Sequence, residues 1–393
     1  MPLNANIPRK QRALVLQGGG ALGAYQAGVL TVLCKELTYE YREGPLFDIV
    51  AGTSIGAMNA AVLVSNVVNR KKTWEGAAKE LENFWTDEAK EEEKKGGLSS
   101  TPTPSKPSGF RKWWWDEIDK ERKFSATSEA SRRYYSVKEY HKRGAPNVSS
   151  APRSKPDLKF TDPDNTWFAY DSGPLQNAIE RYSKDKKDEK LRIATSWDKR
   201  EPRLLVIGVN VAEGKTVAFD SYHTKAQENP KNSVYEGDGI TIDHVMASGT
   251  LPLLYGFRGI PTKGGRKFCD GGILSNTPFR ELLQAHRDYW KGLVSEGQDK
   301  IPDLDVYIIN VHPTKQDTVA TDDYDAVKER TNDIMYSDRN SHYDEMVADL
   351  VTDYKDLVSD YTELVDKLKE LAKNYSQNRD KSDIRFQNDF ENL

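Results

Sequence analysis

A single serine stands between two glycines in the stretch DIVAGTSIGAMNAA, as Gly52-Thr53-Ser54-Ile55-Gly56. An apolar run precedes it and a run of small residues follows, which is the setting of a serine nucleophile on a sharp turn from a strand into a helix. The N-terminus of that helix would stabilise charge developing on Ser54, and the amide of Ile55 would face the same oxyanion. A serine N-cap between two packing glycines gives the same local pattern. The strand before it and the helix after it favour catalysis.

A second glycine turn lies upstream, in QGGGALG, where Gly18, Gly20 and Gly23 fit the pattern G-x-G-x-x-G between a strand and a helix. Such a turn can hold a dinucleotide pyrophosphate, or it can offer bare backbone N–H groups to an oxyanion. A dinucleotide site needs an acidic residue at the end of the second strand. That strand ends in Gly52-Thr53-Ser54, and Asp48 lies at its start. A nucleotide- or acyl-binding protein without turnover is the alternative from another functional class.

A third turn, Asp270-Gly271-Gly272, follows the short strand GRKFC. A carboxylate at that point suits the carboxyl edge of an open α/β sheet, where such sheets place their sites, although an Asx turn has the same pattern. A catalytic triad is a second enzyme hypothesis, because a serine, an aspartate and a histidine follow one another along the chain in the order that some triads use. Its histidine would be His312, which follows a strand, or His286, which lies on a helix. We expect His286 to lie at the surface and His244 to cap or pack a helix.

The elements that must position these turns alternate between strands and helices. Two strand-turn-helix units occupy the first seventy residues and predict an α/β fold with a mostly parallel central sheet flanked by helices. Downstream, Glu213-Gly214 predicts a hairpin turn. The apolar run in residues 303–314 predicts a buried parallel strand.

The remaining segments differ in composition. Residues 86–164 form a charged, Pro- and Trp-containing insertion, and we place the catalytic domain at residues 10–335 around it. Within the insertion, Trp113, Trp114 and Trp115 follow two basic residues, which suits a lipid interface. Packing onto the main domain is favoured, because three adjacent residues cannot share one helix face. Residues 336–375 predict a long C-terminal amphipathic helix, and residues 376–393 predict a flexible tail.

Composition limits the function further. The chain has 393 residues, with 57 basic against 61 acidic residues and a net charge of −4, so we expect no nucleic-acid partner. Cys34 and Cys269 fit no metal or redox spacing, and buried free thiols are expected. The N-terminal residues lack the apolar core of a signal peptide, and no apolar run approaches the length of a membrane span. These features predict a cytoplasmic protein, with peripheral membrane contact left open.

Together, the stretches LVLQGGGALGAYQAGVL, FDIVAGTSIGAMNAA and FCDGGILSNTPF resemble the patatin-like phospholipase family. HVMASGTLPLLYG and YSDRNSHYDEM resemble segments of a bacterial branch of it. The resemblance covers most of residues 12–85 and 165–350. It implies a three-layer sandwich and a hydrolase of carboxylic esters in lipids that needs no cofactor or metal. The physiological substrate and the oligomeric state stay open.

The resemblance also implies roles for single residues. Ser54 would be the nucleophile and Asp270 its base, in a serine–aspartate dyad that works without histidine, so His312 would have no chemical role. Asn276 matches a family position and is expected to be structural. Many relatives carry a basic residue where this chain has Leu22, which leaves the headgroup preference open, and the insertion matches nothing in the family. The resemblance makes Gly18, Gly19 and Gly20 the oxyanion hole and Gly23, Gly52, Gly56, Gly271 and Gly272 the motif glycines.

Overall fold

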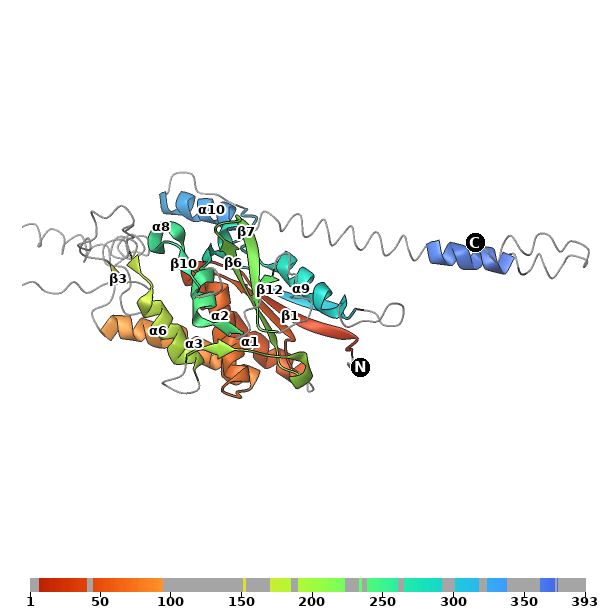
Figure 1. Ribbon diagram of the computed structural model, residues 1–393, viewed down its shortest axis with the longest axis horizontal. Helices are drawn as coiled ribbons and strands as arrows, with labels where there is room; N and C mark the ends of the chain where they lie inside the picture. The colour runs from red at the N-terminus through yellow and green to blue at the C-terminus, as the bar shows by residue number, and fades with distance from the viewer. Residues whose placement is uncertain are drawn as a thin grey trace, which may run out of the picture. The chain divides into compact units, whose positions relative to one another are not determined.

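The computed structural model of the chain is shown in Figure 1. The chain divides into two compact units, residues 1–338 and 339–393, which are described separately. Most of the predicted insertion, including Trp113, Trp114 and Trp115, lies outside the described residues. The structure describes residues 7–40, 45–94, 151–152, 170–184, 190–222, 233–234, 239–260, 265–291, 301–317, 324–337, 361–371 and 373.

The first unit is built on an eight-stranded mixed sheet. Its centre is parallel, with the strands in the order β6 (Arg203–Asn210), β2 (Ile49–Thr53), β1 (Lys10–Leu16) and β12 (Asp303–Ile309). This parallel centre confirms the predicted α/β class. Beyond β6 the pairing is antiparallel, to β11 (Lys267–Asp270) and then β10 (Arg258–Gly259) on one path, and to β7 (Lys215–Asp220) on the other. The remaining strands are short: β8 (Ser233–Val234) on β7, and the pairs β3 (Ala151–Pro152) with β4 (Tyr170–Asp171) and β5 (Arg192–Ile193) with β9 (Ile240–Thr241).

Helices cover both faces of this sheet because alternate residues of each central strand point to opposite sides. On β1, Leu14 and Leu16 belong to the larger apolar cluster, whereas Ala13 and Val15 belong to a second cluster that includes Leu282. The second cluster packs the sheet on α9 (Phe279–Lys291). The larger cluster packs it on α2 (Ile55–Val68) and α7 (Ile242–Ser248). The same cluster includes residues of α1 (Gly23–Glu40), α3 (Trp74–Lys94) and α6 (Gly173–Ser183), which pack on α2.

Short elements complete the unit. The helix α8 (Pro252–Tyr255) follows α7 after a turn, and α10 (Tyr324–Tyr336) follows β12. The 3-10 turns are η1 (Gly20–Leu22), η3 (Trp197–Lys199) and η5 (Gly271–Ile273). Both η1 and η5 come from the glycine turns singled out in the sequence. The turn η5 follows β11 directly, and η1 follows β1 after three residues.

Several local predictions can be compared with the structure. The hairpin at Glu213-Gly214 is confirmed, since β6 and β7 pair antiparallel across it and Gly214 has φ +61°. The cysteines Cys34 and Cys269 are buried free thiols, as expected. The prediction of a buried strand in residues 303–314 is wrong about burial: β12 is parallel to β1 but lies at the end of the sheet, so most of its residues are only half-buried.

In the second unit, residues 361–371 are helical. The side chains of Tyr361, Leu364, Leu368 and Leu371 are exposed there. Most of the predicted helix of residues 336–375, and the tail 376–393, lie outside the described residues. None of the helices in the described part of the chain has the length and hydropathy that a bilayer span requires.

Candidate active site

Ser54 occupies the junction between β2 and α2 in a strained backbone conformation. Its φ is 55° and its ψ is −125°, a combination that side-chain-bearing residues rarely adopt and that occurs mainly at functional sites. The flanking glycines permit the turn. A Cβ on Gly52 would lie 2.4 Å from the Gly56 carbonyl oxygen, and a Cβ on Gly56 would lie 2.2 Å from the Leu16 carbonyl oxygen on β1. The turn therefore has no room for a side chain at either glycine.

The hydroxyl of Ser54 donates to Oδ2 of Asp270 at 2.7 Å. The two residues come from strands on either side of β6, where Thr53 pairs with Ile207 and Asp270 pairs with Gly208. This adjacent register brings together two residues that are far apart in the sequence. Asp270 ends a strand as predicted, but β11 runs antiparallel to β6. The end of β11 nevertheless lies level with Ser54 at the carboxyl end of β2, which is the edge of the sheet where Asp270 was expected.

Burial dominates the electrostatics of Asp270, whose residue is only 2% exposed. Removal from water raises the pKa of its carboxyl to about 6, while hydrogen bonds from Ser54 and from the Gly272 backbone act in the opposite direction. The Gly272 N–H donates to Oδ1 at 2.7 Å, which leaves Oδ2 for the serine. Gly271 is packed so tightly that an added Cβ would lie 2.5 Å from the Ile207 carbonyl oxygen. The carboxyl is thus fixed in place, with a pKa raised toward neutrality.

Ser248 is a member of the site that the sequence reasoning missed. At the end of α7, its hydroxyl accepts the backbone N–H of Ser54 at 2.9 Å and donates to the carbonyl of Ile207 on β6. Thr250, two residues after Ser248, holds Asp270 in a similar way. Its carbonyl accepts the backbone N–H of Asp270 at 3.0 Å. The segment between α7 and α8 therefore holds the backbone of both Ser54 and Asp270.

The glycine loop after β1 packs against Ser54. A Cβ on Gly18 would lie 3.1 Å from the Ser54 Cβ, and Gly20 has φ +55°. Asn276 holds the loop in place: its carbonyl accepts the Gly18 N–H at 3.0 Å, and its Nδ2 donates to the Gly18 carbonyl at 3.1 Å. The same Nδ2 donates to the Tyr336 carbonyl on α10 at 2.6 Å, so Asn276 links the loop to that helix. Further along, Gly23 lets α1 approach α2, because a Cβ there would lie 2.5 Å from Cγ1 of Ile55.

Three histidines lie among the described residues, and none of them bonds Ser54 or Asp270. His312 is buried, and its Nδ1 lies 3.0 Å from Oδ1 of Asp333 on α10. On its other side, Nε2 would lie 3.3 Å from a Cβ placed on Gly19, so the ring packs against the glycine loop. In the triad hypothesis, this histidine would accept the proton of the Ser54 hydroxyl. In the structure, that hydroxyl donates to Asp270.

The other two histidines in the described ranges, His244 and His286, have structural surroundings. His244 caps α7 as expected, with its Nδ1 accepting the Thr241 N–H at 3.0 Å, and burial lowers its pKa to about 4. The expected surface position of His286 is wrong, because α9 turns it toward the sheet and it is 5% exposed. Burial and then Arg203 lower its pKa to about 4, and its Nε2 has no partner among the described residues.

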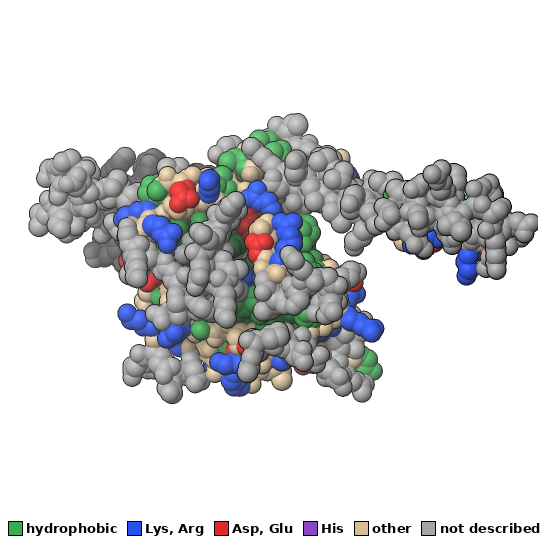
Figure 2. Space-filling model, turned by 45° about the vertical axis from the view of Figure 1, so that its right-hand side comes forward, with side chains coloured by type: hydrophobic (Ala, Val, Ile, Leu, Met, Phe, Trp, Pro, Cys, Tyr) green, Lys and Arg blue, Asp and Glu red, His purple; other side chains and the backbone are tan. Residues whose placement is uncertain are grey.

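Exposed apolar side chains follow two of the glycine turns of the site. Leu22 follows the glycine loop and is 42% exposed, while Ile273 and Leu274 follow Asp270 and are 51% and 44% exposed. Figure 2 shows one face of the molecule, on which hydrophobic side chains reach the surface between charged ones. Within the described ranges, no cluster of three His, Cys, Asp or Glu side chains could hold a metal ion.

Two solved structures of bacterial proteins show low similarity to the chain. One is VipD from Legionella pneumophila, with 15% identity and a TM-score of 0.29, covering 77% of this chain and 50% of that chain. The other is the ExoU–SpcU complex of the type III secretion system of Pseudomonas aeruginosa, with 12% identity and a TM-score of 0.27, covering 83% and 50%. The alignment thus spans half the length of each solved chain. No curated protein matches significantly.

The family comparison is more extensive. Residues 14–283 match the family described as patatin-like phospholipase, and this stretch is more than half of the chain. It contains the glycine loop, the strained Ser54 turn and Asp270, which the fold brings into contact. The chain therefore belongs to the patatin-like phospholipase family, a family of lipid acyl hydrolases.

Proposed function

We propose that the protein hydrolyses carboxylic ester bonds of lipids through an acyl-enzyme formed on Ser54, with Asp270 as the base. The observation that carries this proposal is the 2.7 Å hydrogen bond from the hydroxyl of Ser54, whose backbone is strained, to the buried Asp270 carboxylate. A base with a pKa near the working pH is the most effective proton acceptor, and the raised pKa of Asp270, about 6, meets that need.

The reaction proceeds in two halves. As Ser54 Oγ attacks the ester carbonyl carbon, its proton moves to Oδ2 of Asp270, and that proton then leaves with the alcohol when the ester C–O bond breaks. In the second half, Asp270 takes a proton from water as the water attacks the acyl-enzyme. The proton returns to Ser54 when the fatty acid departs. One carboxylate thus serves both halves, and no histidine takes part.

Backbone N–H groups would stabilise the negative oxygen of each tetrahedral intermediate. The Gly18 N–H is already bonded to the Asn276 carbonyl, so we narrow the predicted oxyanion hole to the amides of Gly19, Gly20 and Ile55. Ile55 is the first residue of α2, where the helix dipole adds to the effect. Glycines in the loop allow the ester oxygen to approach the backbone closely.

The lipid class of substrate agrees with the surroundings of Ser54. Leu22, Ile273 and Leu274 offer exposed apolar surface on which an acyl chain can lie. The family resemblance points to the same substrate class. Membrane contact through Trp113, Trp114 and Trp115 stays a prediction, because these residues lie outside the described ranges.

Hydrolysis of p-nitrophenyl esters of increasing chain length tests the proposal. We expect turnover by the wild type and a loss of at least about a thousandfold in kcat for Ser54→Ala and Asp270→Asn. A fluorophosphonate should add covalently to the wild type but not to Ser54→Ala, as seen by mass spectrometry of the intact protein. Thermal unfolding of both variants controls for misfolding. A folded wild type without turnover on any ester, in solution or with vesicles, would instead favour a binding protein without catalysis.

A further inference from the structure

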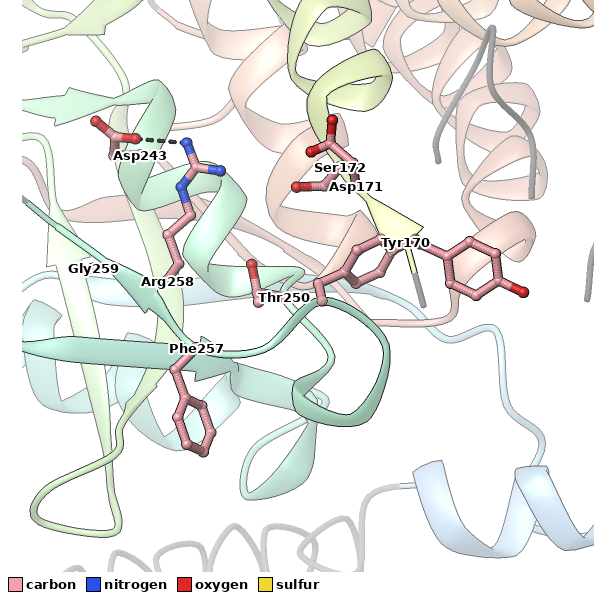
Figure 3. Close-up of a pocket in the computed structure, with 9 residues that line it drawn as sticks. Tyr170, Asp171, Ser172, Asp243, Thr250, Phe257, Arg258 and Gly259 are labelled. Atoms are coloured by element: carbon pink, nitrogen blue, oxygen red, sulfur yellow. Dashed lines mark hydrogen bonds and ion pairs between the residues drawn. The ribbon is translucent and has the colours of Figure 1, made fainter. Parts of the chain in front are cut away.

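A cavity of about 330 Å³ lies among residues of β4, α7, α8 and β10 (Figure 3). Thr250 lines it, and the carbonyl of this same residue accepts the backbone N–H of Asp270 at 3.0 Å. Thr250 therefore connects the cavity to the backbone of the proposed base. Its volume is within the range of roughly 300–1,000 Å³ that small-molecule sites occupy, which is sufficient for a group of about ten heavy atoms.

Charged groups stand on opposite sides of this cavity. Figure 3 shows Arg258 and Asp243 on one side, Asp171 on the other, and Thr250 between them. Arg258 uses Nη2 for both of its contacts, to Asp243 at 2.7 Å and to Gln176 at 2.8 Å. Its Nε and Nη1 groups have no partner within the described part of the chain, so this side of the cavity can donate hydrogen bonds to an anion.

The opposite side suits a cation. Asp171 is exposed, and its Oδ1 accepts the Gly173 N–H at 3.2 Å, which orients the carboxylate at the start of α6. Next to it the rings of Tyr170 and Tyr255 lie 6.3 Å apart and tilted by 51°. A carboxylate beside aromatic faces is the combination that binds ammonium and quaternary ammonium groups. The described lining holds two carboxylates and one guanidinium, a net charge of −1, which disfavours a purely anionic ligand.

We infer that this cavity is a headgroup subsite for a zwitterionic phospholipid, with the phosphate beside Arg258 and the ammonium between Asp171 and the Tyr170–Tyr255 pair. The inference rests on the proposed ester hydrolysis at Ser54 and specifies its substrate class. In a phospholipid the scissile ester and the phosphate are separated only by the glycerol unit. A subsite bounded by Thr250, next to Asp270, is therefore well placed to hold the headgroup while the ester reaches Ser54.

Binding without turnover tests the subsite directly. The Ser54→Ala protein is titrated calorimetrically with phosphocholine and, as the headgroup without an ammonium, with glycerol 3-phosphate. We expect phosphocholine to bind about tenfold more tightly, and we expect Asp171→Asn, in the same background, to remove that preference. Arg258→Gln should weaken both ligands. Asp288→Asn, an exposed aspartate on α9, is the matched control that should keep the tenfold preference.

Kinetics with short-chain, monomeric phospholipids give the second readout. The ratio of kcat/KM for dihexanoylphosphatidylcholine to that for dihexanoylphosphatidylglycerol should favour the zwitterion and should fall about tenfold in Asp171→Asn. Equal ratios in wild type and variant, or equal affinity for the two headgroup probes, would overturn the subsite. A wild type that cleaves neither p-nitrophenyl esters nor phospholipids would instead overturn the proposed hydrolase, whatever the titrations show.

Discussion

The backbone N–H of Ser54 donates to the side-chain hydroxyl of Ser248 at 2.9 Å, although the two residues are separated by 194 positions in the chain. The same hydroxyl donates to the Ile207 carbonyl on β6. Ser248 thus connects the strained turn to the central sheet. A residue that holds a positive φ needs such surrounding support, because the isolated turn would relax to a commoner conformation.

We therefore expect Ser248→Ala to lower kcat for a p-nitrophenyl ester by about tenfold or more, because it frees the Ser54 amide and loosens the turn. Stability should fall by about 1–3 kcal/mol, since a buried donor and a buried acceptor lose their partner. Measurements of kcat and of thermal unfolding check both parts. Ser65→Ala is the matched control, because Ser65 is equally buried but its hydroxyl donates to the Val62 carbonyl within α2, away from the Ser54 turn. If both variants keep wild-type kcat, Ser248 has no role in positioning Ser54.

The raised pKa of Asp270 predicts the pH dependence of the reaction. Asp270 must be ionised to accept the Ser54 proton, and its pKa is about 6. The free enzyme should therefore lose kcat/KM about tenfold for each pH unit below 6 and reach a plateau above about pH 7. A pH–rate profile with a soluble ester checks this. A half-maximal point near pH 4, the ordinary range of an exposed carboxyl, would show that burial does not control this base.

The three glycine turns and the candidate pair Ser54 and Asp270 could be predicted from the sequence because their signals are local. Ser54 lies between glycines at a strand-to-helix turn, and Asp270 ends a strand before two glycines. The residues that join them are set by tertiary structure. Nothing local in HVMASGT marks Ser248 as the partner of Ser54, because the contact depends on how α7 packs against β6.

The direction of β11 and the burial of His286 are also set by tertiary structure, so local sequence signals do not predict them. The sequence of β11 does not show that this strand runs antiparallel to β6, because strand direction depends on pairing with distant residues. His286 shares a polar helix with residues such as Arg287 and Asp288, and only the packing of α9 on the sheet buries it. Long-range pairing, rather than residue type, decides both features.

Glycine at position 56 is required by the close approach of α2 to β1. A methyl group there would lie 2.2 Å from the Leu16 carbonyl oxygen, and that backbone cannot move without displacing the sheet. We expect Gly56→Ala to lose at least about 2 kcal/mol of stability. Gly28→Ala is the control, because a methyl group on this exposed position of α1 has nothing within 4 Å. It should gain about 0.5–1 kcal/mol through helix propensity. Equal melting temperatures would contradict the tight packing at Gly56.

His312 distinguishes the serine–aspartate dyad from a catalytic triad. Its Nδ1 lies within hydrogen-bond distance of Asp333 and its ring packs against Gly19, so in the proposed mechanism it supports the glycine loop. We expect His312→Ala to fold and to keep kcat within about tenfold of wild type, whereas Asp270→Asn should lose at least about a thousandfold. Asp333→Asn, which weakens the same contact from α10, should give an effect similar to that of His312→Ala. A folded His312→Ala protein as inactive as Ser54→Ala would establish the histidine as the base and remove Asp270 from that role.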